Sequence, residues 1–347
     1  MINSLIIGFG FRVKNMIIPA LKTLNDGNIS IYSRNYEKLI SKKNEYSFEP
    51  VQEINNKLLT TVDRIFISIP NNSILETVKN ITKFHTKNIN LYIDTPVVPK
   101  IKNINIKKYI NNFKNIFILE DYYFNPLNDI VKNIIKKNQL SSIKKIEHIN
   151  NGYDYHSLAQ ARDLCNKNKI FYGSKINNIQ NYIFSKCKLK IIGSRKNSGY
   201  TKIETIQDLI IINKPEYNSN FNLDYIYRNN VLSGYKLNDK KIELEKNLEK
   251  DFINMNKICI KFDISSNIIQ EQIISLVNLV RESHKEYGKK YFLKDGITDS
   301  FIIAVTRKFK IFFDLYLFNR SIIYKTFIFI FYIIYMLKRI YNIFKMK

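Results

Sequence analysis

Residues 1–34 read MINSLIIGFGFRVKNMIIPALKTLNDGNISIYSR and carry the strongest structural signal in the chain. An apolar run of strand type ends at Gly8 and Gly10, which flank one residue. Residues 13–24 then predict a helix, and residues 29–32 predict a second strand. Strand, tight glycine turn, helix and strand is the order of a unit that holds a dinucleotide.

The two glycines have separate uses in such a turn. Gly8 lets the chain turn sharply after the strand, and Gly10 has no side chain to keep a pyrophosphate away from the backbone. The N–H groups at the start of the helix then face the phosphates, helped by the helix dipole. Val13 stands where the usual third glycine falls. A plain structural turn is therefore the alternative, and the position inside a strand–helix–strand unit favours coenzyme binding.

The end of the second strand bears on which coenzyme is used. A carboxylate there would accept hydrogen bonds from the adenosine ribose and select NAD. This chain has Ser33 and Arg34 instead. A guanidinium pairs with a 2′-phosphate and stacks on adenine, and Ser33 leaves room and adds a donor. We expect NADP, with NAD as the other choice; the alternative for Arg34 is a solvated surface residue.

Composition sets the broad class of protein. A chain of 347 residues is long enough for two domains, and 45% hydrophobic residues are typical of a globular protein. The net charge of +25 comes from lysines spread along a Lys-, Asn- and Ile-rich chain, the bias of an AT-rich genome. Because no basic run is interleaved with aromatic residues and no zinc-type spacing occurs, we expect no nucleic-acid partner and no metal.

The cysteines and the start of the chain suggest a cellular location. Cys165, Cys187 and Cys259 are odd in number and far apart, which fits a reducing cytoplasm. The N-terminus leads straight into the first strand without a signal peptide. We therefore expect a cytoplasmic protein.

Strands and helices alternate up to residue 124. Such alternation predicts a parallel sheet covered on both faces, with the ligand outside the carboxyl ends of the strands. Those ends carry Pro70-Asn71, Asp94-Thr95 and Glu120-Asp121. The expected strands are 63–69, 89–93 and 115–119, and the expected helices are 36–43, 73–84 and 104–112.

The pattern changes after Pro126. Short alternating segments with turn signals between residues 175 and 245 predict an antiparallel sheet of hairpins. The fold class is thus α/β, with an N-terminal Rossmann domain over residues 1–124 and an α+β domain with a mostly antiparallel open sheet over 125–308. Further helices are expected at 126–137, 157–166, 248–262, 267–287 and 297–308, and a strand at 142–149.

Residues 309–347 form an apolar helical tail. The segment 321–337 is almost wholly apolar and is followed by Lys338-Arg339. It is shorter than the roughly 20 apolar residues of a spanning helix. Two interpretations stay open: an interfacial helix on an anionic membrane, at its inner face, and a tail packed on the second domain or on another subunit.

The chain resembles the Gfo/Idh/MocA oxidoreductases, a family of sugar and cyclitol dehydrogenases that use NAD or NADP. The resemblance extends over roughly residues 1–150, and in outline to about 308. It implies a second domain whose open sheet forms one wall of the substrate cleft and often mediates oligomers. It rests on five segments in this order: IGFGFRVKNMIIPAL, IYSRNYEKL, FISIPNN, YIDTP and LEDYYFNP.

The resemblance also implies roles for residues by position. Ser33 and Arg34 would hold the adenosine end of the coenzyme. The pyrophosphate contacts would be Gly8, Phe9, Gly10, Phe11 and Arg12, and the nicotinamide side would be lined by Pro70, Asn71, Asp94, Thr95 and Asp121.

One departure from the family puts catalysis in doubt. Family members carry Glu-Lys-Pro where this chain has Asp94-Thr95-Pro96. Their lysine favours alkoxide formation and helps to move the proton, and the Thr95 hydroxyl is a poor base at neutral pH. The second catalytic group would be His156, with Asp154 nearby, since imidazole exchanges protons near neutral pH. The alternative for His156 is a helix-start histidine bonded to backbone.

Two hypotheses about function follow. The first is an NAD(P)-dependent oxidoreductase that acts on a sugar or nucleotide-linked sugar in surface polysaccharide synthesis, as a homo-oligomer. The second is a catalytically silent NADP-binding protein of the same fold, acting as a regulatory or scaffold subunit. The missing lysine favours the second, and the retained phosphate turn favours the first.

Overall fold

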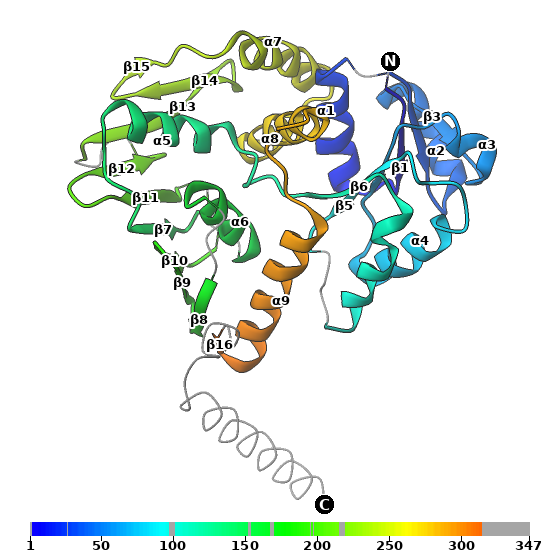
Figure 1. Cartoon of the computed structure of the whole chain (residues 1–347). Coiled ribbons are helices and arrows are strands. Elements are labelled where there is room, and N and C mark those ends of the chain that lie inside the picture. Colours follow the sequence, from blue (N-terminus) through cyan, green and yellow to red (C-terminus); the bar gives the residue numbers. More distant parts are fainter. Residues whose placement is uncertain are drawn as a thin grey trace, which may run out of the picture.

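The computed structural model describes residues 2–25, 27–96, 101–151, 154–166, 170–194, 196, 198–214 and 219–313. The tail segment 321–337 lies outside these ranges. Within them the chain builds two sheets, which stand on opposite sides of the molecule (Figure 1). None of the described helices is long and apolar enough to cross a membrane.

The first sheet is wholly parallel and has the order β3-β2-β1-β4-β5-β6. Its central strands are buried on both faces, which suits their Ile-, Leu- and Phe-rich sequences. The parallel sheet predicted from the sequence is thus confirmed. The strands are β1 Ser4–Ile7, β2 Ile29–Tyr32, β3 Glu49–Val51, β4 Arg64–Ile67, β5 Asn90–Asp94 and β6 Asn115–Leu119.

The helix expected at residues 13–24 has two parts. It begins as a π-helix, η1 Val13–Ile17, and continues as α1 Ile18–Thr23. Pro19 near the junction has no N–H to donate and would crowd the carbonyl one turn back, so a wider turn accommodates it. The other helical segments here are α2 Tyr36–Tyr46, α3 Asn56–Leu59, η2 Asn71–Ser73, α4 Ile74–Ile81 and η3 Ile101–Asn112.

The second sheet has the order β15-β14-β13-β12-β11-β7-β10-β9-β8-β16. Its described pairings are antiparallel except β7 with β10 and β12 with β13, so the mostly antiparallel sheet is confirmed. Its strands are β7 Lys145–Ile149, β8 Ile170–Ile176, β9 Ile179–Phe184, β10 Lys188–Ile192, β11 Tyr200–Glu204, β12 Leu209–Ile212, β13 Phe221–Arg228, β14 Val231–Leu237, β15 Lys240–Lys241 and β16 Ile311–Phe313.

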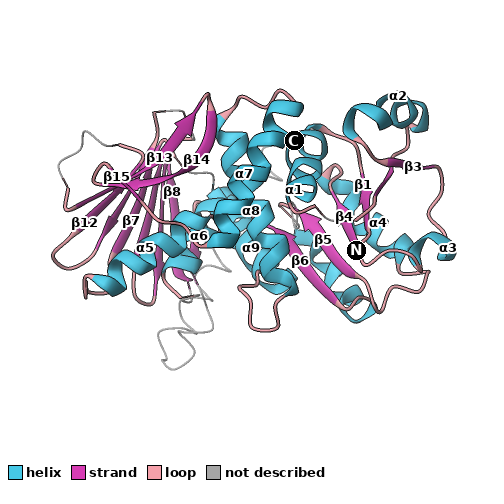
Figure 2. Cartoon of the chain, turned by 90° about the horizontal axis from the view of Figure 1, so that it is seen from above, coloured by secondary structure: helices cyan, strands magenta, loops and turns pink. Residues whose placement is uncertain are grey.

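The helices that follow the first sheet in the chain pack on the second sheet or lie between the two sheets (Figure 2). They are α5 Pro126–Lys137, α6 Asp154–Leu164, α7 Lys246–Lys261, α8 Asn267–His284 and α9 Leu293–Phe309. Helices α7 and α8 return to pack against α1, and the Asn254 side chain donates to the Thr23 carbonyl at 3.1 Å. Helices α7 and α8 therefore pack over α1 on one face of the first sheet.

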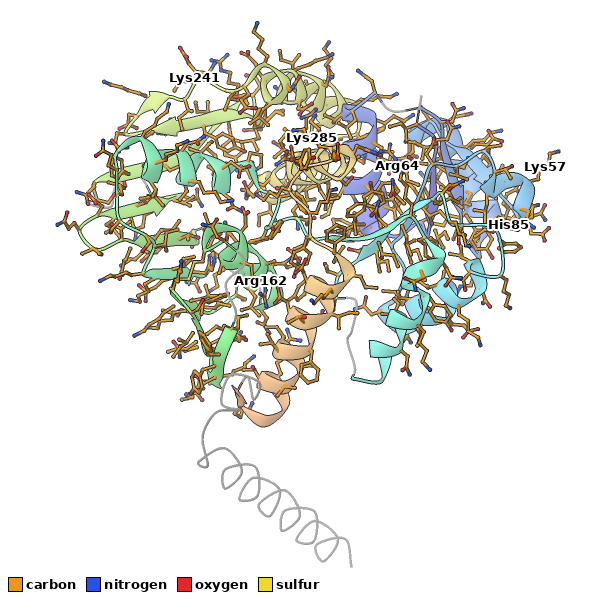
Figure 3. The ribbon with its side chains drawn as sticks, in the orientation of Figure 1. Lys57, Arg64, His85, Arg162, Lys241 and Lys285 are labelled. Carbon is orange, nitrogen blue, oxygen red and sulfur yellow. A yellow bond between two sulfur atoms is a disulfide. The ribbon has the colours of Figure 1, made fainter. Side chains whose placement is uncertain are left out.

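Helix α6 is buried from Ser157 to Leu164 although it carries polar residues. Those residues are bonded: Arg162 Nε lies 2.6 Å from Asp299, and Lys132 Nζ lies 2.6 Å from Asp163. Figure 3 shows Arg162 in the interior of the molecule. Paired charges hold this helix, and with it the start of the second sheet, in one position.

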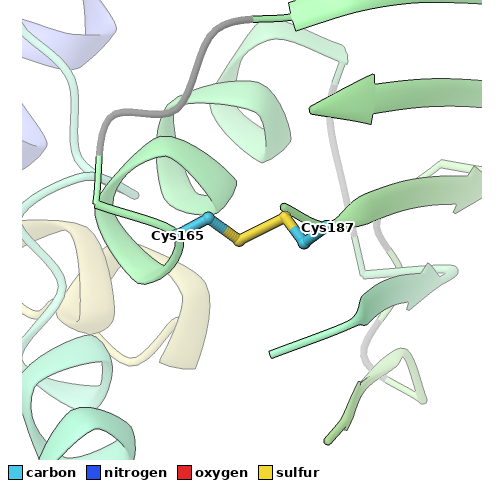
Figure 4. Close-up of a disulfide and its surroundings, with 2 residues drawn as sticks. All are labelled: Cys165 and Cys187. Carbon is cyan, nitrogen blue, oxygen red and sulfur yellow. A yellow bond between two sulfur atoms is a disulfide. The ribbon is translucent and has the colours of Figure 1, made fainter. Parts of the chain in front are cut away.

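Cys165 at the end of α6 and Cys187 before β10 form a disulfide (Figure 4). The expectation that all three cysteines are reduced is wrong for this pair, because the fold brings together two residues 22 positions apart. Cys259 is the free cysteine among the described residues, and it is buried.

Candidate functional site

A pocket of about 670 Å³ lies at the carboxyl ends of β1, β2 and β4. The residues of the glycine turn line this pocket, and so do Ser33, Arg34 and Pro70. The segment after β3, which was not predicted, contributes lining residues that the sequence did not indicate. The helix α4 and the segment after it were expected as a helix, but their residues were not assigned to a site. Together these lining residues are Gln52, Glu53, Ile54, Thr77, Asn80, Ile81 and Phe84.

The two glycines do different things in this turn. Gly8 has φ +113°, and a Cβ there would lie 2.1 Å from the Ser68 carbonyl oxygen, so the turn needs a glycine to approach the end of β4. A Cβ on Gly10 would meet no atom within 4 Å. Gly10 therefore faces open space where it lines the pocket.

The aromatic residues of the turn lie in different environments. The Phe9 ring packs into the core at 5.3 Å from the Phe48 ring centre, so mainly its backbone is left to the pocket. Phe11 is 63% exposed. The open space at Gly10 and the helix start beside it fit the pyrophosphate of a dinucleotide.

Arg12 binds two carboxylates at the ends of neighbouring strands. Its guanidinium donates to both oxygens of Asp121, at 3.0 and 2.8 Å, and its Nε lies 2.7 Å from Asp94. Burial alone would lower the pKa of Arg12, but Asp121 and Asp94 outweigh it and raise that pKa. The structure thus joins three residues that the sequence assigned separately to the pyrophosphate and to the nicotinamide side.

Asp94 and Thr95 follow β5 directly. The Ser68 hydroxyl donates to Asp94 at 2.7 Å, and the Thr95 N–H donates to it at 2.9 Å. Burial raises the pKa of Asp94, and Arg12 opposes that rise. The Thr95 side chain is hydrogen-bonded to the phenol of Tyr155, so β5 and α6 meet here. Asn71 starts η2 and is half-buried.

His156, on α6, meets a carboxylate at the end of a strand of the first sheet. Its Nδ1 lies 2.6 Å from Oε1 of Glu120, which directly follows β6. The imidazole stacks on Tyr122 at 5.1 Å and lies 4.2 Å from the Tyr155 ring centre. Burial raises the pKa of Glu120, and His156 opposes that rise.

Asp154 faces elsewhere. It accepts hydrogen bonds from Gln180 at 2.6 Å and from Arg307 at 2.5 Å. Burial would raise the pKa of Asp154, but these two partners outweigh burial and lower it. Glu120 is therefore the carboxylate beside His156, and the expectation that Asp154 takes this place is wrong.

Two of the other histidines lie outside this site. His85 is exposed and lies at the edge of the molecule in Figure 3. His148 is buried, with Nδ1 2.9 Å from Thr201 Oγ1. In the part of the chain that the structure describes, no group of three or more His, Cys, Asp or Glu side chains is arranged to hold a metal ion.

No family model matches the chain, and no curated protein matches it in sequence. Solved structures do match. Scyllo-inositol dehydrogenase from Lactobacillus casei, with bound cofactor NAD(H) and scyllo-inositol, aligns with TM-score 0.57 and 14% identity over 90% of this chain and 99% of that one.

Two other structures align over a similar length. Myo-inositol 2-dehydrogenase from Lactobacillus plantarum has TM-score 0.56 and 14% identity, over 90% of this chain and 99% of its own. A super-repressor mutant of Gal80p from Saccharomyces cerevisiae has TM-score 0.61 and 12% identity, over 90% and 97%. At this identity the neighbours show the fold alone, and the fold that the resemblance implies, a parallel sheet followed by a mostly antiparallel one, is confirmed.

Proposed function

We propose that this protein binds a nicotinamide dinucleotide, NADP in preference to NAD, and oxidises or reduces a sugar or nucleotide-linked sugar. One observation supports this most. The pocket at the glycine turn leads, through Arg12, to the strand ends where Asp94, Asp121 and the His156–Glu120 pair lie. Coenzyme binding and proton exchange would thus occur at neighbouring strand ends.

The chain's own residues would have distinct roles. Gly8, Gly10 and the start of η1 would hold the pyrophosphate, and Ser33 with Arg34 would hold the adenosine end. A bound nicotinamide supplies the group that accepts or donates hydride. His156 would take or give the proton of the substrate hydroxyl at its imidazole.

Titration calorimetry tests the coenzyme assignment. NADPH should bind more tightly than NADH to the unmodified protein. Arg34→Ala should bring the two affinities together by weakening NADPH about tenfold or more, since a charge-assisted contact to a phosphate is lost. Lys57→Ala, at the molecular edge and outside the pocket lining, is the matched control. Absence of heat with either coenzyme in a folded sample would contradict the proposal.

A second candidate is a silent coenzyme-binding regulatory or scaffold subunit. Thr95 stands in the position of the family lysine, and Arg12 forms ion pairs with both Asp94 and Asp121. The structural neighbour described as a super-repressor mutant is in keeping with a regulatory role for this fold. Tight NADPH binding without turnover across a panel of sugars and nucleotide sugars would favour this candidate. A gain of activity in Thr95→Lys would favour the enzyme.

The location and the assembly are proposed from the sequence alone, and the Cys165–Cys187 disulfide removes the cysteine argument for a reducing compartment. We propose a cytoplasmic protein whose segment 321–337 contacts the inner face of a membrane, as would suit surface polysaccharide synthesis, and which forms a homo-oligomer. Membrane pelleting that resists salt and is lost on deletion from Asn319 onward would support the contact. Recovery of the deletion variant with an altered oligomer size would favour a packed tail instead.

A further inference from the structure

Glu120 is a buried carboxylate with a defined set of contacts. It is fully buried, and its Oε1 accepts the Tyr122 N–H at 3.2 Å and lies 2.6 Å from His156 Nδ1. Its other oxygen, Oε2, is buried without a hydrogen-bond partner in the described residues. A buried carboxylate needs a nearby positive charge or donor, and the His156 imidazole is the group in that position.

The imidazole is held in one orientation. Tyr122 stacks against it with an interplanar angle of 24°, and Tyr155 lies against it at 35°. Tyr155 is itself bonded to Thr95. With aromatic rings packed against it and Nδ1 against Glu120, the ring has little freedom to flip.

The neighbouring charges are engaged with one another rather than with His156. Asp121 and Asp94 both bind Arg12, and Asp154, on the same helix as His156, binds Gln180 and Arg307. The ionisable groups around the imidazole from β5, β6, η1 and α6 thus include the neutralised cluster of Arg12, Asp94 and Asp121, the phenols of Tyr122 and Tyr155, and Glu120. Glu120 contacts the ring directly as a carboxylate.

We propose that Glu120 is the positioning residue of His156. It accepts the Nδ1–H hydrogen bond, which fixes the tautomer and leaves Nε2 as the atom that takes the proton from a substrate hydroxyl. The imidazolium so formed is stabilised by the Glu120 carboxylate, the same logic as in carboxylate–histidine pairs of hydrolases. The substrate in this step rests on the proposed function, whereas the pairing itself does not.

Nuclear magnetic resonance of ¹⁵N-histidine-labelled protein without coenzyme tests the pairing. His156→Asn assigns the signal among the four histidines of the chain. In the unmodified protein the neutral ring should carry its proton on Nδ1. Glu120→Leu keeps the bulk and removes the acceptor, so the neutral ring should lose its preference for the Nδ1–H tautomer.

Two further variants separate positioning from general damage. Glu120→Asp retains a carboxylate acceptor and should retain part of the preference for Nδ1–H. Glu147→Gln removes a buried carboxylate on β7, beside Lys145, and should leave the His156 tautomer unchanged. An unchanged tautomer preference in Glu120→Leu, or a neutral ring protonated at Nε2 in the unmodified protein, would overturn the proposal.

Kinetics give the second readout. In Glu120→Leu, kcat should fall at least tenfold, while the Kd for NADPH stays within threefold because Glu120 does not line the pocket. A fall in kcat that Glu120→Asp does not partly restore would overturn the positioning role. Absence of coenzyme binding in the unmodified protein would overturn the proposed function, and the tautomer measurement without coenzyme would still decide the pairing.

Discussion

Replacing Arg12 by methionine should destabilise the protein by about 3 kcal/mol, because it leaves two buried carboxylates without their cation. The estimate starts from the contacts. Arg12 donates to both oxygens of Asp121 and to the Leu119 carbonyl, and its Nε pairs with Asp94. The Asp121 side chain is only 1% exposed and that of Arg12 is 19% exposed, so solvent screens the pair little.

The magnitude lies at the low end of the range for a broken buried pair. Removing one partner of such a pair costs about 3–5 kcal/mol. Asp94 keeps the donors Ser68 and the Thr95 N–H when Arg12 is lost, which limits the cost. In the Arg12→Met variant, Asp121→Asn removes the charge of the carboxylate that has lost its cation. The free energies of unfolding of the single and double variants should therefore differ from additivity by about 2 kcal/mol, which is the coupling energy of the pair.

Urea unfolding of the four proteins measures this cycle. Far-ultraviolet circular dichroism and tyrosine fluorescence are both usable, since the chain has 23 Tyr and no Trp, and coincident transitions validate the free energies. A loss below about 1 kcal/mol in Arg12→Met, or a coupling below about 0.5 kcal/mol, would refute the reasoning.

The same variant reports on the coenzyme. If Arg12 remains on its carboxylates, Arg12→Met should weaken NADPH binding by less than tenfold. A larger loss would mean that the guanidinium leaves Asp94 and Asp121 to reach the pyrophosphate, since a charge-assisted hydrogen bond contributes about 1.5–3 kcal/mol.

Three other predictions concern the turn, the thiols and acid stability. Gly8→Ala should lower the free energy of unfolding by at least about 3 kcal/mol, because its Cβ would meet a backbone oxygen at 2.1 Å at φ +113°. Gly10→Ala should lower it by less than about 1 kcal/mol in urea unfolding, and should weaken NADPH binding in calorimetry. Burial raises the pKa of Cys259 to about 12, so Ellman's reagent should find no reactive thiol in the native protein, one after denaturation and three after reduction; three without reductant would contradict the disulfide. The lowered pKa of Asp154 contributes stability that is present above the unfolded pKa of about 4 and is lost as the pH falls through the folded pKa. Asp154→Asn should therefore flatten the loss of unfolding free energy below pH 4, and Arg307→Gln should do so in part; an unchanged slope in both would contradict the assignment.

Local sequence determined the elements and much of the site's location. The second strand occupies residues 29–32 as expected, because alternating apolar residues and flanking polar turns encode a strand over a short range. The same reasoning missed β3, Glu49–Val51, since Pro50 in a three-residue edge strand gives no strand pattern. The strand ends were identified correctly, and with them the side of the sheet on which the pocket lies.

Only the tertiary structure decided which charges meet. Arg12 and Asp121 are 109 residues apart, and His156 and Glu120 are 36 apart. Their contacts depend on how η1, β6 and α6 pack, and on Asp154 turning to Gln180 and Arg307 instead of to His156. Periodicity and turn chemistry act within a few residues, whereas an ion pair depends on the distance between atoms that the whole fold brings together.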